Sequence, residues 1–312
     1  GRTEAIMAAR VGKVRLGARV GHMGFLRTYA ASARSLEHCV DQTRDLDRER
    51  YLCNLFLPPT ARPVVFAVHA FNLELARVRE TVSEPTIRRM RLQWWRDTLE
   101  SAARGRPAAN PTAEAVAAAL SAHPVMRPWL DRMIEMRELE LEIELQPADM
   151  VWVDAYAVGT AGSLLHCALE AVGADSDAAH DAAAHVGRAH GLVTALRGLP
   201  HHQAQGYTHL PRTLTEAHDV KLRDLLSSRQ PANLDSAVAE LASSARRSLA
   251  EGDAILRTLP PAARAALAPA AVCGTYLAAL ARAGHDIFDP RLRNLRLRLL
   301  GSLVARNLLG WR

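Results

Sequence analysis

Apolar residues recur at intervals of three and four along most of this chain, which is the spacing of one face of an α-helix. Prolines mark several boundaries, because proline is tolerated in the first turn of a helix but not further in. Pro63 and Pro85 each open a predicted helix. The expected helices span residues 45–54, 62–82, 84–102, 113–122, 129–145, 151–172, 181–199, 236–259 and 290–312. The pattern predicts an all-α, single-domain helical bundle, because no repeat or linker divides the chain.

Two of these helices carry charge that has more than one interpretation. Five glutamates between residues 135 and 144 could suggest a metal site, but we interpret them as a solvated acidic face. The last helix alternates leucines with arginines, and Leu295, Leu299 and Leu303 keep helical spacing. Such a helix either packs on the bundle, which we favour, or lies on an anionic membrane surface.

Composition supports the helical interpretation. Of 312 residues 49% are hydrophobic and only 5% aromatic, and no run of alternating β-branched residues occurs. No apolar stretch has the length of a membrane-spanning helix. The four cysteines are scattered and form no C-x-x-C pair, so we expect neither a zinc site nor a disulfide framework, and a reducing compartment suits them.

The formal net charge of +6 lies largely at the two ends of the chain, and no nucleic-acid motif accompanies it, so we expect no nucleic-acid partner. Up to residue 34 there are seven basic residues and a single acid, Glu4. An arginine-rich, hydroxyl-bearing and acid-poor segment is typical of a mitochondrial transit peptide. We assign residues 1–40 to such a segment or to a disordered basic tail, and residues 41–312 to the folded domain.

The segment around FAVHAF resembles the first helices of the squalene/phytoene synthase family, enzymes that join two prenyl diphosphates head to head. That family carries R-x-x-D-D-x-x-D here. Aligned on FAVHAF, this chain has His69 at the family's tyrosine and Leu73 at its arginine. Ala76 and Arg77 stand at the paired aspartates and Glu80 at the third, so only one acid is kept.

A second aspartate motif of the family resembles GRAHGLVTALRGLPHHQAQGYTHLP. The family's arginine is kept as Arg197. In contrast, Gly191 stands at its glutamine, Gly198 at its aspartate, and His201 and His202 at its acidic pair. Two separate metal-binding motifs have therefore lost acids in one chain.

A third segment resembles the family's Tyr-x-x-x-Gly-Thr/Ser-x-Gly helix, represented by Tyr156, Gly159, Thr160 and Gly162. Small residues allow close approach of neighbouring helices. The segment is therefore compatible with a ligand channel or with plain close packing, and the sequence leaves both open.

The resemblance implies the isoprenoid synthase fold, with a central cavity in which magnesium ions bridge aspartates and diphosphate. Magnesium requires oxygen ligands, which alanine and arginine cannot supply. Glu74 and Glu80 could form a weaker clamp. We predict a pseudoenzyme without catalytic residues, metal or cofactor, in which Arg77 and Arg197 bind an anionic headgroup. The vestigial pocket is expected to comprise His69, Asn72, Leu73, Glu74, Ala76, Arg77, Glu80, Tyr156, Gly191, Arg197, Gly198, His201 and His202.

The segments FNLELA, VSEPTIRRMRLQWW, HVGRAHGLVTALRGLPHH and DIFDPRLR resemble the branch of this family that assists assembly of mitochondrial respiratory complex I. That resemblance implies a matrix protein attached peripherally to the inner membrane, acting early on a membrane-embedded core subunit or an assembly intermediate. The cavity could hold a lipid or an isoprenoid. The alternative is a divergent prenyl diphosphate transferase with an altered metal site.

Overall fold

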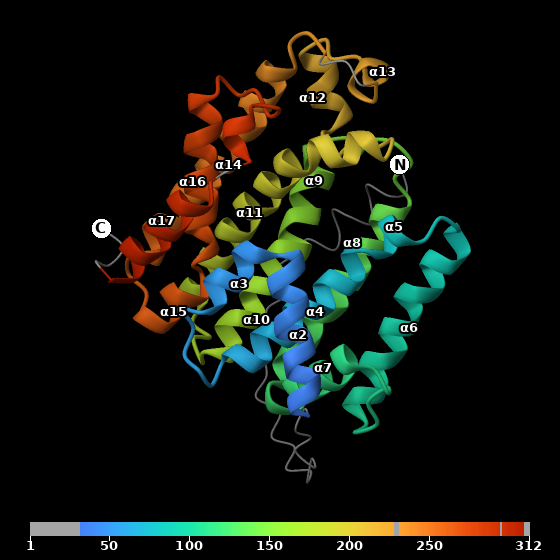
Figure 1. The fold of residues 1–312 in the computed structure, drawn as a ribbon, viewed down its shortest axis with the longest axis vertical. Coiled ribbons are helices and arrows are strands. Elements are labelled where there is room, and N and C mark those ends of the chain that lie inside the picture. Colours follow the sequence, from blue (N-terminus) through green and yellow to red (C-terminus); the bar gives the residue numbers. More distant parts are fainter. Residues whose placement is uncertain (1–31, 228–230, 294, 309–312) are drawn as a thin grey trace.

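The computed structural model describes residues 32–227, 231–293 and 295–308, and within these ranges the chain forms helices and no strand (Figure 1). The all-α prediction is confirmed. The helices are α2 (Ala33–Leu46), α3 (Arg48–Asn54), α4 (Arg62–Ala76), α5 (Val78–Thr81), α6 (Pro85–Ala103), α7 (Pro111–Ala122), α8 (Arg127–Leu141), α9 (Met150–Ala157), α10 (Ser163–Ala171), α11 (Asp177–Ala204), α12 (Arg212–Ala217), α13 (Leu222–Leu225), α14 (Leu234–Leu256), α15 (Pro261–Ala266), α16 (Pro269–Arg282) and α17 (Arg296–Leu308), with short turns η1 (Pro124–Met126), η2 (Val158–Gly162) and η3 (Pro290–Leu292).

Side-chain caps fix where several helices begin. The oxygens of Ser32, Asn110 and Ser176 each accept a hydrogen bond from the backbone N–H three residues on, at 3.1, 3.0 and 3.2 Å. Such a cap satisfies one of the N–H groups that a helix start leaves without a partner, and is worth about 1 kcal/mol. The starts of α7 and α11 were predicted to within a few residues, whereas no helix was predicted at the start of α2.

Two boundaries differ from the prediction. The expected single helix over residues 62–82 divides at Arg77, where α4 ends and α5 begins. The first described helix starts at Ala33 rather than at residue 41, and its Cys39 is fully buried. The hydroxyl of Ser35 also donates to Glu114 on α7, so this helix belongs to the bundle. The rest of the expected transit segment lies outside the described residues.

Five helices were not predicted: α2, α12, α13, α15 and α16. Helices α12, α13 and α15 are six residues long or shorter, which is too short for a 3.6-residue period to show. In α16 nearly every residue is small or apolar and most are buried, so the helix has no polar face to mark its period.

Most of the core consists of two apolar clusters. One surrounds α11, α14 and α16 and includes Leu192 and Leu241. The other joins α4, α6, α7 and α8, and in it Phe71 packs edge-on against Trp95 with ring centroids 5.0 Å apart. Polar side chains of α3, α4, α5 and α11 meet between these elements, and this is where the candidate site lies.

Only some of the apolar residues of α6 are buried. Leu92 and Leu99 are buried against α7 and α8, whereas Ile87, Met90 and Trp94 are exposed. The helix carries two apolar stripes, and spacing within one helix cannot say which stripe meets a neighbour.

The last helix packs on the bundle, as favoured. Leu299 and Leu303 of α17 are buried with Cys53 and Val272 in a small third cluster. None of the helices in the described part of the chain combines the length and apolar character needed to cross a bilayer.

Candidate functional site

The centre of the candidate site is α11, which lies against α9 and η2 at glycine contacts. A β-carbon added at Gly187 would lie 2.3 Å from the Cα of Gly162, and one at Gly191 would lie 2.5 Å from the Cα of Ala157. The Gly159 position is similarly filled by the Met136 side chain. Of the two interpretations left open, the structure shows close packing here. The family's glutamine cannot fit at position 191 without moving a helix.

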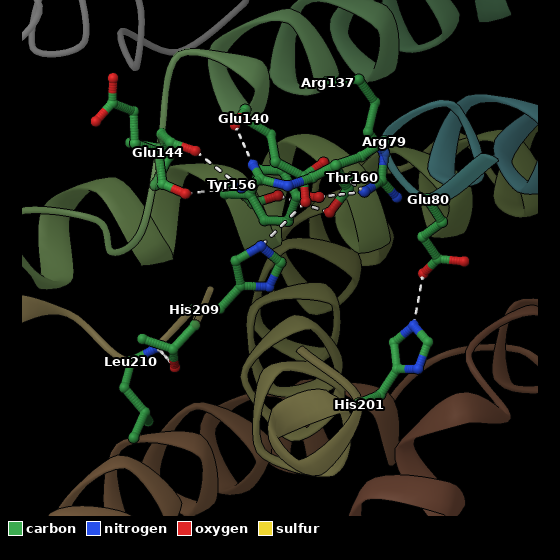
Figure 2. A network of polar contacts seen from close by, with 12 residues as sticks. Arg79, Glu80, Arg137, Glu140, Glu144, Tyr156, Thr160, His201, His209 and Leu210 are labelled. Atoms are coloured by element: carbon green, nitrogen blue, oxygen red, sulfur yellow. Dashed lines mark hydrogen bonds and ion pairs between the residues drawn. The ribbon is translucent and has the colours of Figure 1, made fainter. Parts of the chain in front are cut away.

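One face of α11 carries three polar side chains, which pair with residues of α3 or of α5. Nδ1 of His190 lies 3.3 Å from Arg50 Nη2 of α3. Arg197 pairs with Glu49, also on α3. Further along, His201 Nε2 lies 3.1 Å from the Glu80 carboxylate on α5 (Figure 2).

The pair between Glu80 and His201 joins the two aspartate-motif positions of the family. Both residues were predicted for the site from separate segments, and the structure brings them together. An acid and a base face each other where the family pattern has two acids. The contact with His201 occupies one oxygen of the acid that the first motif keeps.

A buried polar group closes the inner end of this face. Asp47 Oδ2 lies 2.5 Å from Arg50 Nη1, and His69 Nδ1 lies 3.0 Å from Asn54 Nδ2. Burial, with the nearby Arg50 charge, lowers the pKa of His69 and of His190 to about 3. Burial raises the pKa of Asp47, but Arg50 outweighs it and holds the pKa below its usual value. The two imidazoles are therefore neutral beside one fixed ion pair.

A second buried network ties α8 to α9 and to the segment after α11 (Figure 2). Glu140 accepts hydrogen bonds from Arg137 at 2.9 Å and from His209 at 3.0 Å, and Arg137 also donates to the Tyr156 hydroxyl. Burial alone raises the pKa of Glu140, but Arg137 and His209 outweigh it and hold the pKa well below its usual range. The expectation of a solvated acidic face is wrong for this glutamate, since it is only 4% exposed.

Arg79 connects this network to α5. Its guanidinium donates to the backbone carbonyls of Glu140 at 2.6 Å and Ile143 at 2.8 Å. It also stacks over the Tyr207 ring, 4.0 Å from the ring centroid. The guanidinium is therefore occupied in holding the end of α8 against the segment that follows α11.

The second aspartate position is filled by a histidine ring. A β-carbon at Gly198 would lie 2.6 Å from His202 Cε1. The His202 ring lies between Tyr207 and His209, with centroids 4.8 and 4.4 Å away. Burial, with His209 beside it, lowers the pKa of His202 to about 3. Its Nδ1 is buried without a hydrogen-bond partner in the described residues, and the Glu140 carboxylate, which favours the charged form, does not offset the effect of burial on the pKa.

The remaining predicted residues of α4 differ in how far they are buried. Asn72 is buried, and Leu73 and Ala76 are half-buried. Glu74 accepts a hydrogen bond from Gln42 of α2 at 2.8 Å, whereas Glu80 faces α11, so the alternative clamp of these two glutamates does not form.

The predicted pair of arginines for an anionic headgroup is also not assembled. Arg197 is engaged by Glu49 and lies over the Tyr276 ring at 5.6 Å. Arg77 is exposed at the junction of α4 and α5. A guanidinium that already binds a carboxylate can bind a phosphate only by giving up that partner.

The donor set does not fit magnesium. Asp47, Glu49, Glu80 and Glu140 each face an arginine or a histidine. Across the described ranges, no group of three or more histidine, cysteine, aspartate or glutamate residues is placed to hold a metal ion. Magnesium bound to prenyl diphosphate needs carboxylates that are free to ligate it, whereas these four carboxylates are each paired with an arginine or a histidine.

Sequence reasoning missed several residues of these networks, among them Asp47, Arg50, Arg137, Glu140 and His209. A usable signal existed for the last three of these. Arg137 and Glu140 are three apart on a helix, which places them as neighbours. His209 directly precedes the Leu-Pro that kept the family's frame. The sequence did not reveal that the pair is buried.

The geometry thus defines a prenyl synthase scaffold whose motif positions pair with each other. The profile of the family described as "Squalene/phytoene synthase" matches residues 43–300. The chain belongs to the squalene/phytoene synthase family.

Its similarity to individual proteins is of two kinds. It is 34% identical over 275 residues to the mouse protein "NADH dehydrogenase (ubiquinone) complex I, assembly factor 6", covering 88% of this chain and 81% of the mouse protein. The crystal structure of squalene synthase HpnC from Alicyclobacillus acidocaldarius matches with a TM-score of 0.71 at 20% identity, over 81% of this chain and 95% of that one. A ligand-bound dehydrosqualene synthase matches with a TM-score of 0.73 at 18% identity, over 87% and 96%. The two structures show a shared fold.

Proposed function

We propose that this chain is an assembly factor for respiratory complex I and that it does not catalyse prenyl condensation. The assembly role is supported by the similarity to the mouse assembly factor over most of both chains. The observation that carries the non-catalytic part is the contact of Glu80 with His201. The acid that is kept from the first motif is bonded to the base that replaces an acid of the second.

The proposed loss of chemistry has a simple electrostatic basis. A diphosphate leaves only when cations neutralise the charge that develops on its oxygens. In this site the cationic groups Arg50, Arg137 and Arg197 are each bound to a carboxylate of the same chain. The pair of Arg197 with Glu49 links α11 to α3, whereas the pairs of Arg50 with Asp47 and of Arg137 with Glu140 lie within one helix or its cap and leave these guanidinium groups occupied.

We further propose where the protein acts. It would enter the mitochondrial matrix by its basic N-terminal segment, attach peripherally to the inner membrane, and assist a membrane-embedded core subunit early in complex I assembly. The arginine-rich, acid-poor composition of the first residues supports the targeting step. The name of the mouse relative supports the process.

The test replaces, in the source organism, the one acid kept from the first motif, Glu80, together with Glu74 of the same segment. A Glu74→Gln, Glu80→Gln double variant keeps hydrogen-bonding side chains but removes both charges that could hold a metal. We expect deletion of the gene to lower complex I on native gels, and the double variant to restore it to the wild-type level. If the double variant is folded yet behaves like the deletion, these carboxylates have a chemical role, and the divergent transferase becomes the better account.

A further inference from the structure

The outer face of α17 is apolar and exposed. Leu299 and Leu303 pack inward, whereas Leu297 is 84% exposed, Leu300 37% and Val304 42%. The three exposed residues are spaced three and four apart, so they form one stripe along the outer side of the helix. In Figure 1 α17 lies at one edge of the molecule, on the opposite side from α6. The helix therefore has two apolar faces, and the fold uses only one.

The part of the chain that carries this stripe is strongly basic. Residues 290–312 contain six arginines and no acid. Arg291 and Arg306 are paired with aspartates that lie outside this segment. Arg293 and Arg298 are exposed, one before α17 and one within its first turn beside the stripe. An exposed apolar stripe with flanking arginines is the pattern of a helix that lies in a lipid interface.

We propose that α17 docks the protein on the surface of an anionic bilayer. The stripe of Leu297, Leu300 and Val304 would enter the interface, and Arg293 and Arg298 would contact lipid phosphates. At 13 residues the helix is about 20 Å long, shorter than the roughly 30 Å hydrocarbon core, so it lies on the membrane. The inference deepens the proposed function, because it names the surface responsible for the peripheral attachment proposed there.

A bilayer fits this surface better than a protein groove. The guanidinium fork binds phosphate oxygens in two parallel hydrogen bonds, and an anionic bilayer offers phosphates on every side of the helix. The inner face of α17 is already packed, so the stripe can be buried without unfolding anything. A protein partner would need an apolar groove with an acidic rim of matching spacing.

The experiment is vesicle flotation of the purified full chain. Vesicles of phosphatidylcholine with phosphatidylglycerol are compared with phosphatidylcholine alone. We expect binding to the anionic vesicles only, weakening with salt. A Leu297→Ser, Val304→Ser variant should bind about tenfold more weakly or worse, since burial of one such side chain accounts for roughly that factor. An Arg293→Gln, Arg298→Gln variant should lose about fivefold per arginine.

The matched control is an Ile87→Ser, Met90→Ser variant, which removes exposed apolar side chains from α6 at the opposite edge. It should bind like the wild type, and all variants should unfold at the wild-type temperature. Wild-type binding by the stripe variant, or equal loss in the α6 control, would overturn the proposal. So would a stripe variant that still floats but no longer co-purifies with complex I subunits, which indicates a protein-binding surface. Flotation uses no complex I, so a chain that restores assembly but fails to float separates this inference from the proposed function.

Discussion

At the scale of single residues, Glu140 shows how a charge is kept in the core of this bundle. It has an arginine and a histidine as partners, and Tyr156 shares the arginine. Burying a carboxylate without partners would lower the stability of the fold by several kcal/mol. Loss of any one partner is therefore expected to weaken the whole network. Position in the family pattern did not mark this glutamate, because the residues that neutralise it come from three separate segments.

We predict that Glu140→Gln lowers the free energy of unfolding by about 3–5 kcal/mol, because it leaves Arg137 buried without a counter-charge. Urea unfolding of the variant measures this. The control is Glu142→Gln, two residues away and exposed, which should change stability by less than about 0.5 kcal/mol. Equal effects of the two substitutions would mean that the network does not hold the fold.

We also predict that the protein loses stability in mild acid. Burial lowers the pKa of His69, His166 and His190 to about 3, with Arg50 adding to the effect at two of them and His180 at the third. The unfolded chain binds protons at these histidines below about pH 6.5, while the folded chain does not. Stability is therefore complete above that pH and falls by up to about 1.4 kcal/mol per histidine for each unit below it.

The carboxylates of this part of the molecule do not reverse that trend. Asp47 lies beside His69 and His190, and its lowered pKa makes it a further loss only in stronger acid. Denaturation curves recorded between about pH 7 and pH 5 test the prediction. A midpoint that stays constant over this range would contradict the neutral, buried state of the histidines.

At the scale of elements, the glycines of α11 explain why the helix lies so close to α9 and η2. We predict that Gly191→Ala destabilises the protein by about 1–3 kcal/mol through overpacking against Ala157. Gly301→Ala in α17 is the control, because a β-carbon there meets open space. It should stabilise by up to about 1 kcal/mol, since alanine is the better helix former. The two substitutions are expected to differ in sign, and thermal unfolding shows it directly.

A helix could be predicted from the sequence where its apolar residues form a single stripe. Some helices with a cap or an opening proline were expected close to their observed starts, as α6 at Pro85 shows, whereas α15 and α16 also begin with proline and were missed. Which face of α6 is buried could not be predicted, because Ile87 and Leu92 belong to two apolar stripes of similar strength. Which stripe of α6 is buried depends on how α7 and α8 pack against it, and the sequence of α6 alone does not determine this.

The candidate site was predictable in part for a similar reason. Alignment on the family's frame found Glu80 and His201, which the structure joins. It could not find that Arg197 would be occupied by Glu49, since that contact depends on how α3 meets α11. Contacts between residues that lie far apart in the chain depend on how the helices pack. A sequence motif identifies only one residue of each such pair.

At the scale of the whole molecule, ion pairs link helices of a prenyl synthase bundle that has no free carboxylate pair for magnesium at the motif positions. The two apolar clusters supply the mass of the core, and the polar contacts of α11 with α3 and α5 connect them. Under the proposed function, this molecule would keep the fold of the squalene/phytoene synthase family and use it in the assembly of complex I without catalysing prenyl condensation.

The most direct test of this account is turnover of the purified protein with farnesyl and geranylgeranyl diphosphate in the presence of magnesium. Products are measured by mass spectrometry, with an active dehydrosqualene synthase as the positive control. The account predicts no condensed prenyl product and no released diphosphate from a preparation that restores complex I. Formation of a head-to-head product by that preparation, abolished by Glu80→Gln, would contradict it.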